Sequence, residues 1–94
     1  MTGRGGFGSL AFRMTVQVYF HSYFKDLTGT AAAAESLPVG ATLGNLHERL
    51  MARFPKLAAM RKSTLLAVGV EYQPGTYPLK ENDEVSLFPP VQGG

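Results

Sequence analysis

The group in this sequence best suited to do chemistry is the carboxylate of its last residue, Gly94. Gly93 and Gly94 carry no side-chain bulk and adopt almost any backbone angle, so they can thread a channel that alanine or valine would block. Alone, this ending is a weak signal, because a frayed terminus or a cloning scar would look the same in a chain with 11 glycines. The residues that precede the Gly-Gly ending strengthen the interpretation that it is functional.

A proline pair joins the Gly-Gly ending to an alternating apolar run. Val85 and Leu87 alternate with polar residues and predict a strand that ends at Phe88. Pro89 and Pro90 offer no backbone N–H and fix φ, so the chain must leave the sheet there. Residues 89–94, if extended, carry the carboxylate about 20 Å beyond the last paired residue. That reach is enough to enter a cleft in another protein.

We therefore expect the tail to work inside a partner protein. Its root is expected to contact that partner, together with the sheet face that the main helix does not cover. The residues with expected roles are Phe88, Pro89, Pro90 and Val91 for partner binding, Gln92 and Gly93 for threading, and Gly94 as the reacting group.

Other residues that could carry catalysis or bind metals are scarce. The chain has no cysteine, so it has no thiolate nucleophile, and a reducing compartment is the default expectation. His21 and His47 lack ligand partners at suitable spacing, so we expect no metal site. There is no G-x-x-x-x-G-K-[ST] loop, so we expect no bound cofactor and no ATP site in this chain.

Composition and charge narrow the function classes. A chain of 94 residues with 45% hydrophobic content predicts one domain with a modest core. No apolar run approaches the roughly 18–20 residues that span a bilayer, and no secretion signal is recognisable, so we expect a cytoplasmic protein without membrane contact. The net charge of +2 comes from Arg4 and Arg13, and the remaining seven basic and seven acidic residues disfavour nucleic-acid binding.

Residues 1–13 are Gly-rich, lack apolar periodicity and precede a second methionine, Met14. They predict a flexible leader, dispensable for folding, ahead of a domain at residues 14–94. An upstream start codon or cloning residues would explain them. An RGG-type nucleic-acid contact at residues 4–7 is the alternative, for which a single copy is thin support.

Periodicity predicts the elements of residues 14–94. Val16, Val18 and Phe20 share one face of a first strand. Ser22 is expected to cap a short helical turn at residues 23–28, which Gly29 ends. Residues 31–37 contain four alanines, which favour a helix, but the segment is short and bracketed by Gly and Pro residues. We interpret them as a strand that pairs with the first.

The main helix is predicted to begin after Thr42, a good N-cap, and to end at Pro55, with one further turn over residues 56–62. Its apolar stripe is Leu43, Leu46, Leu50, Met51 and Phe54. Residues 49–62 carry five basic residues and no acid, which indicates a solvated face or, less often, a docking surface for an acidic partner.

The later elements complete a mixed sheet. Residues 65–70 are apolar enough to predict a strand buried on both sides at the sheet centre. Residues 71–78 predict a loop, residues 80–83 a turn, and residues 84–88 the last strand. The predicted core consists of Val18, Phe20, Leu46, Leu50, Phe54, Val68 and Leu87. This order predicts an α+β fold, with a mixed sheet of four to five strands and one main helix on one face.

The order of elements and the ending Phe88-Pro89-Pro90-Val91-Gln92-Gly93-Gly94, preceded by Asp83-Glu84-Val85, resemble the β-grasp, ubiquitin-like sulfur carriers of the MoaD/ThiS type. Members of the MoaD family, the small subunits of molybdopterin synthase, typically end in D-E-V followed by P-P-V-x-G-G. Residues 23–29 and 37–42 also resemble segments of that family. ThiS carriers share the fold and the Gly-Gly but usually lack the Pro-Pro.

The resemblance implies a sulfur donor in molybdopterin biosynthesis, with Gly94 as a thiocarboxylate. An E1-like, MoeB-like adenylyltransferase would activate Gly94 with ATP, and a MoaE-like large subunit would hold the catalytic pocket. The chain would then be a reagent more than an enzyme. The alternatives are a ThiS-like carrier of another pathway, a ubiquitin-like modifier that ends on a target lysine, and a β-grasp scaffold module.

Overall fold

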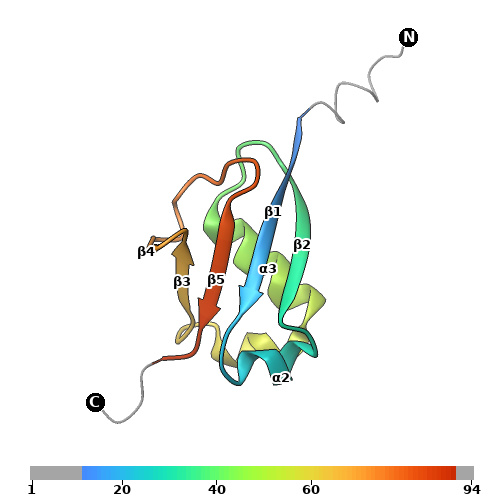
Figure 1. Ribbon diagram of the computed structural model, residues 1–94, viewed down its shortest axis with the longest axis vertical. Coiled ribbons are helices and arrows are strands. Elements are labelled where there is room, and N and C mark those ends of the chain that lie inside the picture. Colours follow the sequence, from blue (N-terminus) through green and yellow to red (C-terminus); the bar gives the residue numbers. More distant parts are fainter. Residues whose placement is uncertain (1–11, 91–94) are drawn as a thin grey trace.

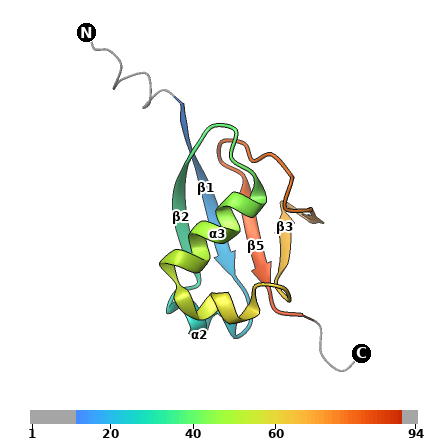
Figure 2. The same ribbon diagram turned by 180° about the vertical axis from the view of Figure 1, so that it is seen from behind.

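The computed structural model describes residues 12–90, which form a five-stranded mixed sheet with its main helix packed on one face (Figures 1 and 2). The predicted α+β class is confirmed. In chain order the elements are β1 (Arg13–Phe20), α2 (Phe24–Thr28), β2 (Ala32–Pro38), α3 (Leu43–Arg53), the 3₁₀ helix η1 (Pro55–Met60), β3 (Leu65–Val68), β4 (Glu71–Tyr72) and β5 (Glu84–Phe88).

The sheet has the strand order β2-β1-β5-β3-β4, so β5 is the central strand. β1 and β5 are parallel, with Phe20 opposite Leu87, and the other neighbouring pairs are antiparallel. Because β1 and β5 run in the same direction, their C-terminal ends lie at the same end of the sheet, where α2 also lies (Figure 1). The chain beyond Phe88 therefore leaves the fold beside the residue that follows Phe20.

The predicted position of residues 65–70 at the sheet centre is wrong. β3 ends at Val68, and it lies between the central strand and the short edge strand β4. Gly69 turns the chain with φ 62°, and Val70 is 99% exposed. The parallel pairing of β1 with β5 fills the centre instead, because it inserts the last strand between the first and the third. Part of the expected loop at residues 71–78 also pairs, since Glu71 and Tyr72 form β4.

The main helix begins and ends as predicted. The Thr42 side chain accepts a hydrogen bond from the Asn45 N–H, and the Asn45 side chain accepts one from the Thr42 N–H, which completes a capping box. Helix α3 ends before Pro55, which opens η1. In Figure 2, α3 crosses the sheet diagonally. The chain continues from its C-terminal end into η1, which is drawn in yellow at the bottom of the view near α2.

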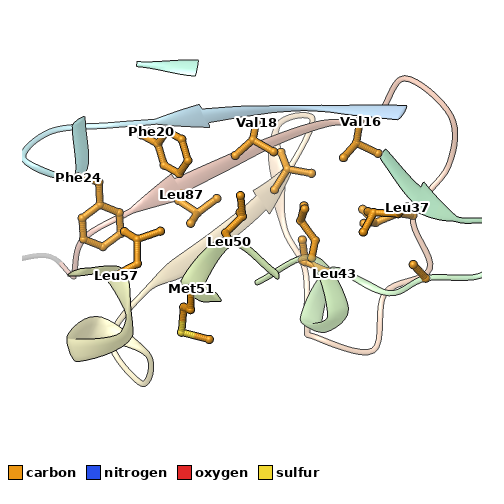
Figure 3. Packing of buried hydrophobic residues seen from close by; sticks show 14 of the residues in the cluster. Val16, Val18, Phe20, Phe24, Leu37, Leu43, Leu50, Met51, Leu57 and Leu87 are labelled. Carbon is orange, nitrogen blue, oxygen red and sulfur yellow. The ribbon is translucent and has the colours of Figure 1, made fainter. Parts of the chain in front are cut away.

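The core lies between α3 and the sheet (Figure 3). Val18, Leu46, Leu50 and Leu87 are fully buried, and Phe20 is 2% exposed, as predicted. The other two predicted members are only partly buried and pack against this cluster; they are Phe54 and Val68. Further buried residues extend it toward both ends of the sheet, among them Val16, Phe24, Leu37, Leu43, Leu57 and Val85.

The start of α2 corrects one local prediction. Ser22 does not cap the helix, because its φ of 57° places it outside the extended region that an N-cap adopts, and Tyr23 precedes the first helical residue without a side-chain cap. Gly29 ends the helix in the left-handed conformation with φ 79°, as predicted.

The N-terminal boundary of the fold lies slightly earlier than expected. Arg13 already pairs with Pro38, and the Val39 N–H donates to the Phe12 carbonyl. Both residues therefore belong to the end of the β1–β2 pair. The rest of the predicted leader, residues 1–11, lies outside the described residues, so its flexibility stays a prediction.

Within the described range, no helix has the length and apolar character needed to cross a membrane.

Candidate functional site at the root of the tail

Phe88 is the last residue of β5 and the point from which the chain leaves the sheet. It pairs with Leu65 of β3 and is half-buried, as are Pro89 and Pro90 after it. The structure thus places the predicted partner-binding residues Phe88, Pro89 and Pro90 together at one end of the central strand. The remaining predicted site residues lie outside the described range; they are Val91, Gln92, Gly93 and Gly94.

Strand alternation decides which way Phe88 faces. Val85 and Leu87 are fully buried on the side that α3 covers, so Phe88 faces the uncovered side. His21 follows Phe20, the residue opposite Leu87, and faces the same side as Phe88. The two rings stack with centroids 4.4 Å apart and planes 10° apart. The His21 N–H donates to the Leu87 carbonyl at 3.1 Å, which extends the ladder by one residue.

A third aromatic ring completes this surface. Tyr72 lies on β4 opposite Ala67, on the uncovered side, and its ring meets that of Phe88 edge to face with centroids 6.3 Å apart. Tyr72 is 66% exposed. We refer to His21, Tyr72 and Phe88 as the tail-root cluster.

Two members of the tail-root cluster escaped the sequence analysis. Local sequence marks His21 only as a candidate metal ligand, because its place beside Phe88 depends on a parallel pairing between the two ends of the described chain. For Tyr72 the sequence predicts a loop, because a two-residue strand carries no periodic signal. The resemblance to β-grasp carriers is the signal that points to His21, because the first and last strands of that fold are parallel neighbours.

The tail-root cluster combines apolar ring surface with polar groups, namely the Tyr72 hydroxyl and the His21 imidazole nitrogens. The His21 Nε2 atom is buried and has no hydrogen-bond partner within the described part of the chain. Buried polar atoms are normally paired, so this nitrogen is an exception within the described residues. Tyr and Phe rings are enriched where protein surfaces meet.

The basic run at residues 49–62 is largely paired within the domain. Arg49 and Arg53 both form ion pairs with Glu35, and Arg61 pairs with Glu48. Because these three arginines already pair with carboxylates of the same domain, the structure favours a solvated helix face over a docking surface for an acidic partner. Nearby, burial lowers the pKa of His47; Glu48 opposes this shift and Arg61 adds to it.

Comparisons with known proteins identify the family and the fold. Residues 18–94 match the ThiS family. The chain belongs to this family. The molybdopterin synthase sulfur carrier subunit of Arabidopsis thaliana is 28% identical over 79 residues, which are 84% of this chain and 82% of that protein. The subunit of the same name from Aedes aegypti is 30% identical over 87 residues, with 84% of this chain and 88% of that protein covered. The predicted resemblance to MoaD/ThiS sulfur carriers is confirmed.

Three solved structures share the fold of this chain. The putative molybdopterin converting factor subunit 1 of Pyrococcus furiosus is 27% identical, with a TM-score of 0.76 over 83% of this ThiS-family chain and 99% of that chain. A complex of subunits 1 and 2 of the molybdopterin-converting factor from Helicobacter pylori contains a chain that matches with a TM-score of 0.63 at 23% identity, covering 86% of this chain and 100% of that one. The ubiquitin of Caldiarchaeum subterraneum matches at 0.61 and 15% identity, over 87% of this chain and 99% of that one. The last two show the fold alone, and the predicted ubiquitin-like β-grasp class is confirmed.

Proposed function

We propose that this chain is the sulfur-carrying small subunit of a molybdopterin synthase and holds its sulfur as a thiocarboxylate on Gly94. The observation that carries the proposal is the match to the ThiS family over residues 18–94, which includes the Gly-Gly ending. The relatives named for this role support the choice of pathway, since each aligns with 84% of this chain. In this proposal the chain is the sulfur donor, and the catalytic pocket belongs to a larger partner.

The chemistry begins with activation of Gly94 by an E1-like, MoeB-like adenylyltransferase. A carboxylate is a poor electrophile, so the partner transfers AMP from ATP to one carboxylate oxygen and releases pyrophosphate. A sulfur donor then attacks the carbonyl carbon, the bond from carbon to the AMP oxygen breaks, and a thiocarboxylate remains. ATP is bound and consumed by the activating enzyme, not by this chain.

The transfer step takes place in the MoaE-like large subunit. The thiocarboxylate sulfur is a soft nucleophile that stays ionised at neutral pH. It attacks an electrophilic carbon of the bound pterin precursor, so that a carbon–sulfur bond forms while a carbon–oxygen bond at that carbon breaks and the oxygen keeps the electron pair. Water then cleaves the thioester between Gly94 and the transferred sulfur, which regenerates the carboxylate. The structure of the Helicobacter pylori complex of subunits 1 and 2 supports a large-subunit partner, because one of its chains shares this fold.

The tail-root cluster supports the proposed mode of contact. Phe88 presents a half-buried ring beside the point where the chain leaves the sheet, and Tyr72 adds exposed aromatic surface. Aromatic anchors of this kind often contribute most of the binding energy at an interface. In this proposal the cluster docks together with Pro89, Pro90 and Val91, while Gln92 and Gly93 thread the donor into the partner's channel.

The test is a reconstituted assay with the adenylyltransferase, ATP, a sulfide source and the large subunit. Deleting Gly94 should abolish pterin product while the domain stays folded, because one residue moves the carboxylate by about 3.6 Å and a misplacement of about 1 Å can cost roughly a hundredfold in rate. Gly93→Val should reduce transfer without changing the reach. Deleting Thr2 is the matched control, since it shortens the chain equally at the other terminus.

Normal turnover by the variant that lacks Gly94 would refute the carrier role. If cells that carry the Gly94 deletion lose lysine conjugates while pterin synthesis is unaffected, that result would favour the ubiquitin-like modifier. Transfer to an acceptor other than a pterin would favour a ThiS-like carrier of another pathway.

A further inference from the structure

β2 is the long open edge of the sheet. Among the strands of residues 12–90 it is terminal in the order and pairs only with β1, whereas the opposite edge strand, β4, has two residues. The side chains of Ala32, Ala34 and Ser36 point to the uncovered face, because their neighbours Ala33, Glu35 and Leu37 face α3 with Val18, Val16 and Met14. Small side chains do not obstruct an incoming strand, and open edges of this length are templates for pairing with another chain.

The register identifies the backbone groups that face outward. The Phe20 N–H donates to the Ala31 carbonyl at 2.9 Å, so Ala31 directs its polar groups toward β1. Alternate residues of an antiparallel pair bond to the same neighbour. The carbonyls of Ala32, Ala34 and Ser36 therefore point to the open edge.

Each of these three carbonyls accepts a hydrogen bond from a side chain of the same domain. Thr30 Oγ1 donates to the Ala32 carbonyl at 2.8 Å. Arg53 Nη1 donates to the Ala34 carbonyl at 3.4 Å. Arg13 Nη2 donates to the Ser36 carbonyl at 2.9 Å, and its Nε donates to Ser36 Oγ at 3.3 Å.

These three side chains, which we call the edge caps, come from α3, from β1 and from the turn before β2. Arg53 belongs to α3, and its guanidinium pairs with Glu35, the one buried charged residue in the described range. The same guanidinium lies 5.0 Å from the centre of the Phe54 ring. Arg13 reaches the edge from β1. A strand that tried to pair with β2 would have to displace both guanidinium groups, and a second copy would bring two more positive charges to the same place.

We propose that Arg13 and Arg53, with Thr30, close the β2 edge against pairing with a second copy of this chain. The caps occupy the acceptors that a β2–β2 ladder needs, and the positive charges oppose the approach of an identical edge. This inference does not depend on the sulfur chemistry.

The experiment compares the self-association of the full chain with that of two double variants by analytical ultracentrifugation over a concentration series. The capping variant is Arg13→Ala with Arg53→Ala. The matched control is Arg49→Ala with Arg61→Ala, which removes the same charge from side chains that pair only with carboxylates. We expect the capping variant to self-associate roughly tenfold more tightly or better, with slower amide exchange at Ala34 and Ser36 in the associated form, and the control to match the parent.

Arg13→Ala alone is measured as well, because it leaves the Glu35 ion pairs intact and so tests the edge even if the double variant folds poorly. A capping variant that stays as monomeric as the parent, with native circular dichroism, overturns the proposal. Equal self-association of the matched control also overturns it, because net charge alone would then explain the effect.

Discussion

The two faces of the sheet differ in what they bury. On the face beneath α3, Val16, Val18, Val85 and Leu87 have no exposed surface, while the other face leaves Tyr72 66% exposed and Phe88 half-buried. Leu87 and Phe88 are consecutive residues of β5, yet they serve opposite faces. Strand alternation thus lets one strand contribute to the core on one face and to the proposed contact surface on the other. Substitutions on the two faces should therefore have separable effects.

The largest effect is expected beneath α3. Leu50 is fully buried in the main helix, so Leu50→Ala removes apolar contacts and leaves a cavity. The free energy of unfolding should fall by about 2–5 kcal/mol, which is a large share of the stability of a small domain. Urea denaturation followed by circular dichroism measures this change. A loss below about 0.5 kcal/mol would mean that this face does not hold the fold together.

The next effect is expected on the uncovered face. Phe88→Ala removes the central ring of the tail-root cluster and should weaken the complex with the large subunit by about 2 kcal/mol, roughly thirtyfold in Kd. The free energy of unfolding should fall by only about 1 kcal/mol, because the lost contacts are those with His21 and Tyr72. Calorimetric titration and denaturation of the same variant separate the two quantities. A large loss of stability with unchanged binding would make Phe88 a core residue.

A smaller, pH-dependent effect is expected at His47. Because burial lowers its pKa in the folded state, the unfolded chain binds more protons between the folded pKa and the ordinary value of about 6.5. Stability from this group is therefore present above about pH 6.5 and is lost as the pH falls below it. The free energy of unfolding should decrease from pH 7.5 to pH 5.5 more steeply for the parent than for His47→Gln. Parallel pH profiles would show that burial of His47 does not contribute.

The smallest effect is expected at the N-terminus. Deleting residues 1–11 should leave the melting temperature and partner binding unchanged, because the first residues of the leader contribute no apolar periodicity. Deleting residues 1–13 should cost more, since it also removes Phe12 and Arg13, which hydrogen-bond to the β2 end. Differential scanning calorimetry of both truncations tests this. A clear loss from the shorter truncation would show that the leader packs on the domain.

The sequence correctly predicts those elements whose signals lie in residues that are neighbours along the chain. Alternation followed by Pro89 predicted β5 with its observed bounds, and Thr42 with the apolar stripe predicted α3. The same alternation placed Leu87 inside the fold, and it makes Phe88 an outward-facing neighbour. These patterns need only neighbouring residues, so one sequence is enough to read them.

The features that the sequence did not predict depend on pairing between distant segments. The stacking of His21 on Phe88 needs β1 and β5 to be parallel neighbours, and the edge caps need Arg13 and Arg53 to meet at β2. β4 is too short to carry a periodic pattern. The expected roles of Val91, Gln92, Gly93 and Gly94 lie beyond the described residues and stay predictions.

The most direct test of the central claim is the intact mass of the protein purified from its own cells. A sulfur carrier should show a species in which one oxygen is replaced by sulfur, and fragmentation should place the sulfur on Gly94. Treatment with a thiol-reactive alkylating reagent should shift that species alone, because the chain contains no cysteine. An unmodified carboxylate in every molecule, even after incubation with the adenylyltransferase, ATP and sulfide, would contradict the account.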